Sequence, residues 1–185
     1  MPAWPYGAIE GVDVTCDTRQ QAGKHAHVDA AFDAMGLTHA YAKLDFGDYM
    51  RPGSNVSVDT KQHIEELASN LGRDHERFRR ECERARDAGY RLVVLVEGMG
   101  GVEDLPGLAA WFARRCSACR IPCGRESCRL HRVTPARAAS LVKSMATMRR
   151  KYGVEFMFCD RSETALVIAR LLGLEERCLS SATRR

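Results

Sequence analysis

The segment Arg91–Glu97 (RLVVLVE) constrains the fold more than any other part of the chain. Its five central residues, Leu92–Val96, are all apolar, and the glycine-rich segment Gly98–Gly101 follows at once. A continuous apolar run of this length is typical of a strand that is covered on both of its faces. The segment therefore predicts a central strand of a sheet that lies between helices.

The rest of the chain alternates between strand-like and helix-like patterns. Strands are predicted over Glu10–Asp17, Thr38–Phe46, Val56–Lys61 and Val154–Asp160. Helices are predicted over Val28–Met35, Gln62–Leu71, Asp74–Ala88, Leu105–Phe112, Pro135–Tyr152 and Ser162–Leu172. Turn residues at Arg51–Asn55 predict a hairpin between the second and third of these strands. We therefore expect an α/β fold with a mixed central sheet flanked by helices.

Length and composition restrict the class of protein. With 185 residues, the chain is expected to fold as one domain over residues 1–185. No apolar run approaches the roughly 20 residues that a membrane span needs, so no membrane partner is expected. Met1–Ile9 lacks the basic and apolar regions of a secretory signal. We expect a cytoplasmic protein of a bacterial or phage-infected cell, with its eight cysteines in a reducing environment.

Acidic residues gather at the ends of the predicted strands. Asp17 ends the first strand, and Asp48 follows Gly47 after the second. Asp59 and Lys61 are two residues apart on the third strand, so their side chains point to one face. Glu65 lies one helical turn beyond Lys61. Carboxylates packed together repel each other unless a proton or a cation neutralises them, and oxygen ligands suit Mg²⁺ or Mn²⁺. The pattern predicts a metal-dependent phosphodiester hydrolysis site.

These motifs resemble a known family. Asp17-Thr18-Arg19-Gln20, Gly47-Asp48-Tyr49 and Asp59-Thr60-Lys61 with Glu65 resemble the nuclease domain of XPF-type structure-specific endonucleases, within the PD-(D/E)XK nuclease superfamily. The chain looks most like the compact versions carried by phages and prophages. The resemblance implies a restriction-endonuclease-like core, in-line attack of water on a phosphodiester of branched DNA, and a 5′-phosphate product.

The resemblance also assigns roles to individual residues. Asp48 and Asp59 would be the principal metal ligands, Asp17 would complete the acidic pocket, and the backbone carbonyl of Thr60 would be a further ligand. Lys61 would serve the attacking water, and Arg19 would contact the scissile region or hold the acids in place. The sequence departs from the family pattern at Gln20, where Glu is common, at Asp59-Thr60, which replaces Glu-Arg, and at Glu65, which replaces Asp.

A basic stretch runs from Arg114 to Lys151. It holds eleven arginine and lysine residues, and Glu126 is its only acid. Such local asymmetry suits a polyanion, because phosphate contacts dominate the affinity for nucleic acid. The candidate DNA-binding residues are Arg114, Arg115, Arg120, Arg149, Arg150 and Lys151. By contrast, the charges of Arg73–Arg86 alternate as they do in helices with solvated ion pairs, and we assign that helix no chemistry.

A cysteine-rich insert covers residues 114–132. Its candidate zinc ligands are Cys116, Cys119, Cys123, Cys128 and His131. Tetrahedral zinc needs four such ligands at short spacing, but reduced free thiols and a redox pair stay open alternatives. Cys16, Cys82 and Cys159 lie in apolar contexts and are interpreted as core thiols.

The sequence as a whole predicts a Mg²⁺- or Mn²⁺-dependent DNA endonuclease of the repair and recombination type. A homodimer that pairs through Leu166, Ile168, Leu171 and Leu172 is a further expectation. Two alternatives remain at this point. One is a catalytically weak DNA-binding module of the same fold, which Gln20 would favour. The other is a zinc-stabilised partner-binding protein whose acids are structural.

Overall fold

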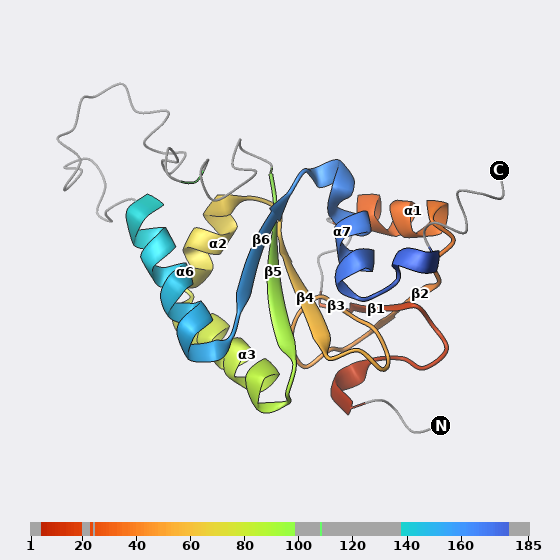
Figure 1. The fold of residues 1–185 in the computed structure, drawn as a ribbon, viewed down its shortest axis with the longest axis horizontal. Coiled ribbons are helices and arrows are strands. Elements are labelled where there is room, and N and C mark those ends of the chain that lie inside the picture. The colour runs from red at the N-terminus through yellow and green to blue at the C-terminus, as the bar shows by residue number, and fades with distance from the viewer. Residues whose placement is uncertain (1–4, 20–22, 24, 99–107, 109–137, 178–185) are drawn as a thin grey trace.

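The structure is a computed structural model, and it describes residues 5–19, 23, 25–98, 108 and 138–177. The predicted helix over Leu105–Phe112 and the cysteine-rich insert lie almost wholly outside these residues. The described residues form a six-stranded sheet with helices on both faces (Figure 1).

The sheet has the strand order β2-β1-β3-β4-β5-β6. In chain order the strands are β1 (Val14–Asp17), β2 (His39–Ala42), β3 (Tyr49–Met50), β4 (Val56–Lys61), β5 (Arg91–Glu97) and β6 (Glu155–Cys159). β1 pairs with β2 in parallel, and β4, β5 and β6 are parallel to one another. Only the two-residue strand β3 is antiparallel to its neighbours among the described strands. The expected α/β fold with a mixed central sheet flanked by helices is confirmed.

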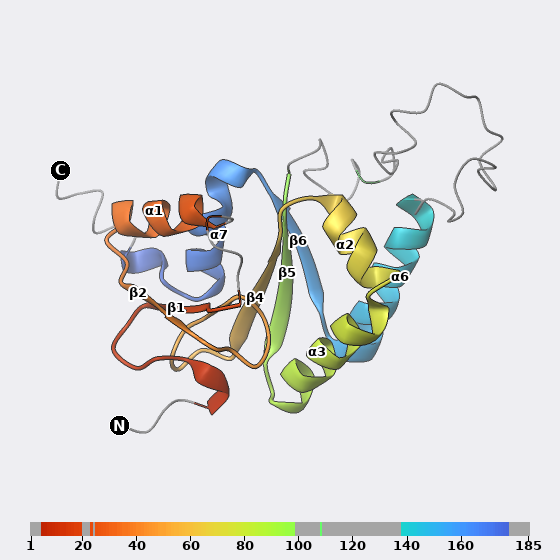
Figure 2. The ribbon, with the colours of Figure 1, turned by 180° about the vertical axis from the view of Figure 1, so that it is seen from behind.

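Two groups of helices cover the sheet. α1 (Ala26–Ala34) and α7 (Thr164–Leu171) pack together on one face, next to the short 3₁₀ turn η2 (Arg161–Glu163). α2 (Ile64–Leu71), α3 (His75–Asp87) and α6 (Ala138–Tyr152) cover the other face (Figures 1 and 2). A second 3₁₀ turn, η1 (Pro5–Gly7), precedes β1.

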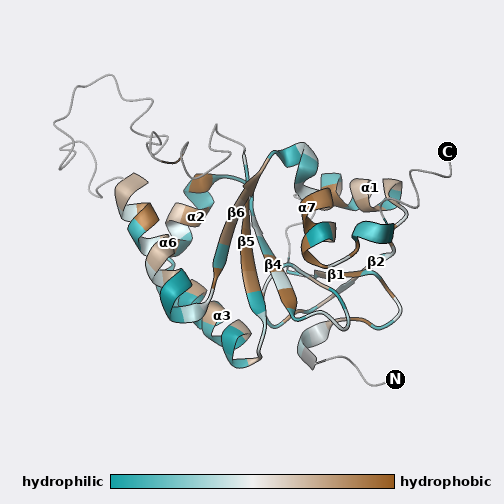
Figure 3. Ribbon diagram, in the orientation of Figure 1, coloured by the Kyte–Doolittle hydropathy of each residue, from teal (hydrophilic) through white to brown (hydrophobic). Residues whose placement is uncertain are grey.

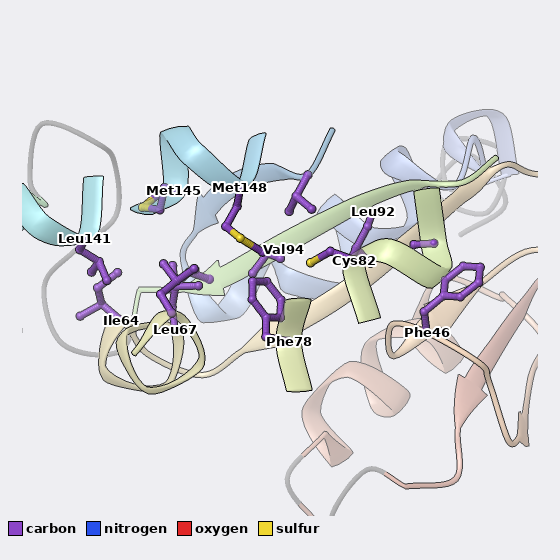
Figure 4. Packing of buried hydrophobic residues seen from close by; sticks show 14 of the residues in the cluster. Phe46, Ile64, Leu67, Phe78, Cys82, Leu92, Val94, Leu141, Met145 and Met148 are labelled. Carbon is purple, nitrogen blue, oxygen red and sulfur yellow. The ribbon is translucent and has the colours of Figure 1, made fainter. Parts of the chain in front are cut away.

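The central strand β5 contributes side chains to both halves of the core. Leu92 and Val94 pack under α2, α3 and α6, with Phe78, Leu67 and Met148 around them (Figure 4). Val93 and Leu95 point the other way and pack under α1 and α7. Figure 3 shows β5 as mostly hydrophobic along its length. The apolar run is therefore explained as predicted, because the strand is buried on both faces.

The predicted hairpin is wrong in one strand. Thr38–Phe46 does not pair with Val56–Lys61. Its first half, β2, adds to β1 in parallel, and the partner of β4 is β3. Leu44 and Phe46 are buried in the core under α2 and α3, which explains why this apolar pattern looked like a longer strand. The turn at Arg51–Asn55 is present, with Gly53 at a φ of 80°.

Three further expectations concern membrane spans, buried thiols and a homodimer. No helix in the described part of the chain combines the length and apolar character needed to cross a membrane. Cys16, Cys82 and Cys159 are buried free thiols, as interpreted from the sequence. Ile168 of α7 and Leu172, just after it, are buried in the core of the same chain, so packing within one chain already explains why they are apolar. The homodimer stays a prediction.

Candidate active site

The strand directions bring three aspartates to one edge of the sheet. β1 and β4 run the same way and both end at this edge, while β3 begins there. The register places Tyr49 opposite Cys16 on one side and Val58 on the other, so Asp48, one residue earlier, lies between Asp17 and Asp59. The amide of Asp17 donates to the Asp48 carbonyl (2.8 Å), and the Asp48 amide donates to the Val58 carbonyl (2.8 Å).

Asp59 and Lys61 form a buried ion pair on β4. The Lys61 Nζ lies 2.7 Å from Asp59 Oδ1, and the two residues are 7% and 3% exposed. The other carboxylate oxygen, Asp59 Oδ2, is buried and has no hydrogen-bond partner among the described residues. Burial of the carboxylate in a pocket that already holds other acids is costly, and pairing with Lys61 offsets only part of that cost.

The pKa values of this pair report an excess of negative charge. Burial raises the pKa of Asp59 above its ordinary value, and the nearby carboxylates Glu81 and Asp48 add to the effect, while Lys61 opposes it. Burial lowers the pKa of Lys61, but Asp59 and Asp48 outweigh burial and raise it above its ordinary value. Both shifts mean that the pocket favours added positive charge, whether a proton or a cation.

Asp48 is held by the strand beside it and by the turn before it. Its Oδ2 accepts hydrogen bonds from the Thr60 amide (2.8 Å) and the Thr60 hydroxyl (2.6 Å). Gly47 has a φ of 67°, and a Cβ there would lie 2.1 Å from Ser57 Oγ. Only glycine fits this close approach in a left-handed conformation. The Gly47-Asp48 sequence is therefore needed to present Asp48 to the pocket.

Asp17 is held by the loop that follows β2. Its Oδ1 accepts from the Leu44 amide (3.1 Å), and its Oδ2 accepts from Arg19 Nε (2.7 Å). Arg19 also donates to the Leu44 carbonyl. Arg19 thus holds an acid in place, which is one of the two roles that the resemblance implied for it.

These side chains share one cavity of about 740 Å³. Asp17, Asp48 and Asp59 all line it, together with Arg19, Thr60 and Lys61. His25, at the start of α1, lines it as well and is buried. The three aspartates that are far apart in the chain therefore converge beside an ammonium group.

The sequence missed the contribution of the helices. Glu81 of α3 lines the cavity, and its Oε1 accepts from the Gly47 amide (2.9 Å). Arg77, Arg80 and Arg84 of α3 line it too, so this helix faces the candidate site, which was not predicted from the sequence. From α2 it is Glu66, not Glu65, that reaches the cavity, and Glu65 lies 3.7 Å from His63 instead. The sequence did contain one signal of this, because positions 77, 80, 81 and 84 fall on one face of a helix.

The donor set fits a hard divalent cation. Asp59 Oδ2 is an orphaned buried oxygen, and the Asp48 carboxylate lies one strand away. Within the described residues there is no group of three or more His, Cys, Asp or Glu side chains placed to hold a metal ion. Mg²⁺ does not require one, because it is usually bound by one or two carboxylates and keeps several waters.

The remaining predicted residues lie elsewhere. Arg149, Arg150 and Lys151 are exposed on the last turn of α6, which leads into the start of β6, the sheet edge opposite the aspartates. They do not line the cavity. The other predicted DNA contacts (Arg114, Arg115 and Arg120) and the candidate zinc ligands (Cys116, Cys119, Cys123, Cys128 and His131) lie outside the described residues.

Comparison with known proteins places the chain in a family and relates its fold to a solved structure. The model of the ERCC4 domain family matches residues 16–171, a range that contains every aspartate of the cavity. A solved structure of XPF from Aeropyrum pernix, in complex with DNA, superposes with a TM-score of 0.53 at 22% identity. The match covers 94% of this chain and 66% of that chain, so this chain spans less than two thirds of the other protein's length. No curated protein matches.

Proposed function

Because this chain belongs to the ERCC4 domain family, we propose that it is a DNA endonuclease of the repair and recombination type, which hydrolyses phosphodiester bonds in branched or otherwise structured DNA. The observation that carries the proposal is the convergence of Asp17, Asp48 and Asp59 on one cavity beside Lys61. The family match spans all four residues.

The chain's own residues have distinct tasks in this reaction. Lys61 is held by Asp59 with its ammonium at the cavity wall, where it can orient a water for attack or stabilise negative charge on phosphorus. Thr60 fixes the Asp48 carboxylate through two hydrogen bonds, and Arg19 fixes that of Asp17. Such pre-oriented groups need no rearrangement when charge develops.

A divalent cation, Mg²⁺ or Mn²⁺, is part of the proposal. Asp59 and Asp48 would hold it, with the Thr60 carbonyl as a further ligand. When bound, it would neutralise phosphate charge and lower the pKa of a water. The orphaned Asp59 oxygen and the raised pKa of Asp59 support a cation here, because both indicate a buried carboxylate that lacks positive charge.

The most direct test uses a panel of labelled DNA substrates. Flap, fork, junction, duplex and single-stranded DNAs would be incubated with the protein in Mg²⁺, in Mn²⁺ or in EDTA. We expect cleavage of at least one branched substrate in either metal and none in EDTA. The Asp59→Asn variant, checked for folding by circular dichroism, should bind the same substrate without cutting it.

Two outcomes would count against the proposal. Uniform inertness in both metals, with DNA binding retained, would replace it with a DNA-binding module of the same fold. Inertness without DNA binding would leave the acids as structural residues.

A further inference from the structure

α3 carries two kinds of arginine, and they lie on different faces of the helix. Arg79 pairs with Glu76 (2.9 Å) and Glu83 (2.6 Å), and Arg86 pairs with Asp87 (2.7 Å). These two arginines do not line the cavity. Arg77, Arg80 and Arg84 do line it, and within the described residues they form no ion pair with a carboxylate. The charge pattern of the helix is therefore uneven.

The acids of α3 form their close ion pairs and hydrogen bonds with groups other than the side chains of the cavity-lining arginines, although Glu76 also interacts electrostatically with Arg80. Glu76 and Glu83 share Arg79, and Asp87 holds Arg86. Glu81 lies on the same face as the cavity-lining arginines, but its Oε1 accepts from the Gly47 amide. The side-chain bonds given for Arg80 and Arg84 go to backbone carbonyls, those of Glu76 (3.3 Å) and Asp45 (3.1 Å).

The three arginines follow one another closely along one side of the helix. An α-helix rises 1.5 Å per residue, so Arg77, Arg80 and Arg84 are about 4.5 and 6 Å apart along the helix axis. All three are exposed, so their guanidinium groups are accessible to a ligand. Guanidinium groups bind phosphate through paired hydrogen bonds, and counterion release makes such contacts favourable.

From this arrangement we propose that Arg77, Arg80 and Arg84 of α3 form a phosphate-binding wall that holds the backbone of the DNA strand to be cut against the aspartates. The inference rests on the proposed function for the identity of its ligand. The wall and the acids line the same cavity, so a phosphate held by the arginines lies next to the one that is hydrolysed. These arginines therefore contribute to binding more than to chemistry.

The helix supplies its own control for a test. The double variant Arg77→Gln with Arg80→Gln removes two charges from the wall. The double variant Arg79→Gln with Arg86→Gln removes two charges from the ion-paired face of the same helix. Binding of each to a fluorescent branched DNA would be measured in EDTA over a range of KCl concentrations, so that cleavage does not interfere.

We expect the wall variant to lose about tenfold or more in affinity at 0.1 M salt, and the control variant to lose less than about twofold. The slope of log K against log salt should become shallower by about 0.7 to 0.9 for each lost phosphate contact, so by about 1.4 to 1.8 for the wall variant. A third variant, Arg77→Lys with Arg80→Lys, keeps both charges and should keep the salt slope.

The outcomes separate this inference from the proposed function. Equal affinity losses in the wall and control variants, or no loss in either, would overturn the inference even if the protein cuts DNA. A wild-type protein that never cuts, but whose affinity depends on the wall and not on the control face, would overturn the endonuclease and support the wall. Thermal unfolding of each variant shows that a lost affinity is not a lost fold.

Discussion

The two faces of the sheet each bury an acid near the end of a central strand, and they use it differently. On the face under α2 and α3, Asp59 of β4 is 3% exposed, pairs with Lys61 and opens into the cavity. On the face under α1 and α7, Glu97 of β5 is 1% exposed. Its Oε1 lies 3.3 Å from His27 Nε2, and its Oε2 lies 4.0 Å from Arg161 Nε. Glu97 does not line the cavity.

The contrast shows that burial of a carboxylate does not by itself identify a catalytic group. Both Asp59 and Glu97 have buried oxygens without a hydrogen-bond partner among the described residues. The face of Asp59 differs because it also holds a further acid one strand away, a lysine and a cavity that these residues line. Glu97 instead lies beside His27 and Arg161, and none of these three residues lines the cavity.

The largest expected effect compares the two acids directly. Asp59→Asn should slow cleavage by at least about a hundredfold, because the pocket loses a charged group that acts on the transition state. Glu97→Gln should change the rate by less than about threefold, because Glu97 does not line the cavity. Single-turnover cleavage in Mg²⁺ measures both. Comparable losses in the two variants would remove the distinction between the faces.

The next effect concerns the link between α3 and the turn before β3. Glu81→Ala should lower the free energy of unfolding by about 1.5 to 3 kcal/mol, because the Gly47 amide loses a charged acceptor. Glu81→Gln keeps an acceptor oxygen and should restore most of that loss. Glu83→Ala, which removes an ion pair with Arg79 on the other face of the helix, should cost less than about 1 kcal/mol. Urea unfolding gives all three values, and equal costs for Glu81→Ala and Glu83→Ala would contradict the link.

A smaller effect is expected on the opposite face. His27→Ala should lower the free energy of unfolding by about 1 to 2 kcal/mol, because Glu97 then loses the nearer of its two ion-pair partners among the described residues. Adding Glu97→Gln should recover part of this cost, because the buried charge is then absent. A double-mutant cycle from urea unfolding measures the recovery. Additive costs would show that His27 and Glu97 do not interact.

The smallest expected effect concerns the three buried cysteines, which should not react in the folded protein. Burial raises the pKa of Cys16 to about 12 and that of Cys159 to about 11, and it also raises the pKa of Cys82. The thiolate is the reactive form, so at pH 8 these thiols should resist iodoacetamide, and reactivity should appear only as the pH approaches the raised pKa values. Mass spectrometry with and without urea checks this. Labelling of Cys82 alone in the folded protein would mean that the core under α3 opens more readily than the other.

Part of this picture could be predicted from the sequence. The alternation of Asp59 and Lys61 on a strand, the Gly47-Asp48 turn and the apolar run of β5 are local patterns, and local patterns survive in the fold. β3 could not be found this way, because two residues show no periodicity. We therefore predicted Thr38–Phe46 as the partner of β4, and did not predict that β2 pairs with β1 in parallel.

The contribution of α3 was missed for a different reason. In the sequence, Glu81 is one of several acids between arginines, and any of them could pair along the helix. Only the fold shows that Glu81 meets the Gly47 amide while Glu76 and Glu83 pair with Arg79. The identity of an ion-pair partner depends on helix orientation against the sheet, which one sequence does not define.

The shortness of β3 has a consequence for how the molecule loses its pocket. Asp17 and Asp59 sit on strands that are not direct neighbours, and the two residues of β3 bridge them. Segments with few backbone bonds open locally at lower free energy than the protein unfolds as a whole. Amide protons of Asp48 and Tyr49 should then exchange with deuterium sooner than those of β5. Because Tyr49 and Met50 are buried in opposite cores, opening of β3 would separate the acids and loosen both cores together.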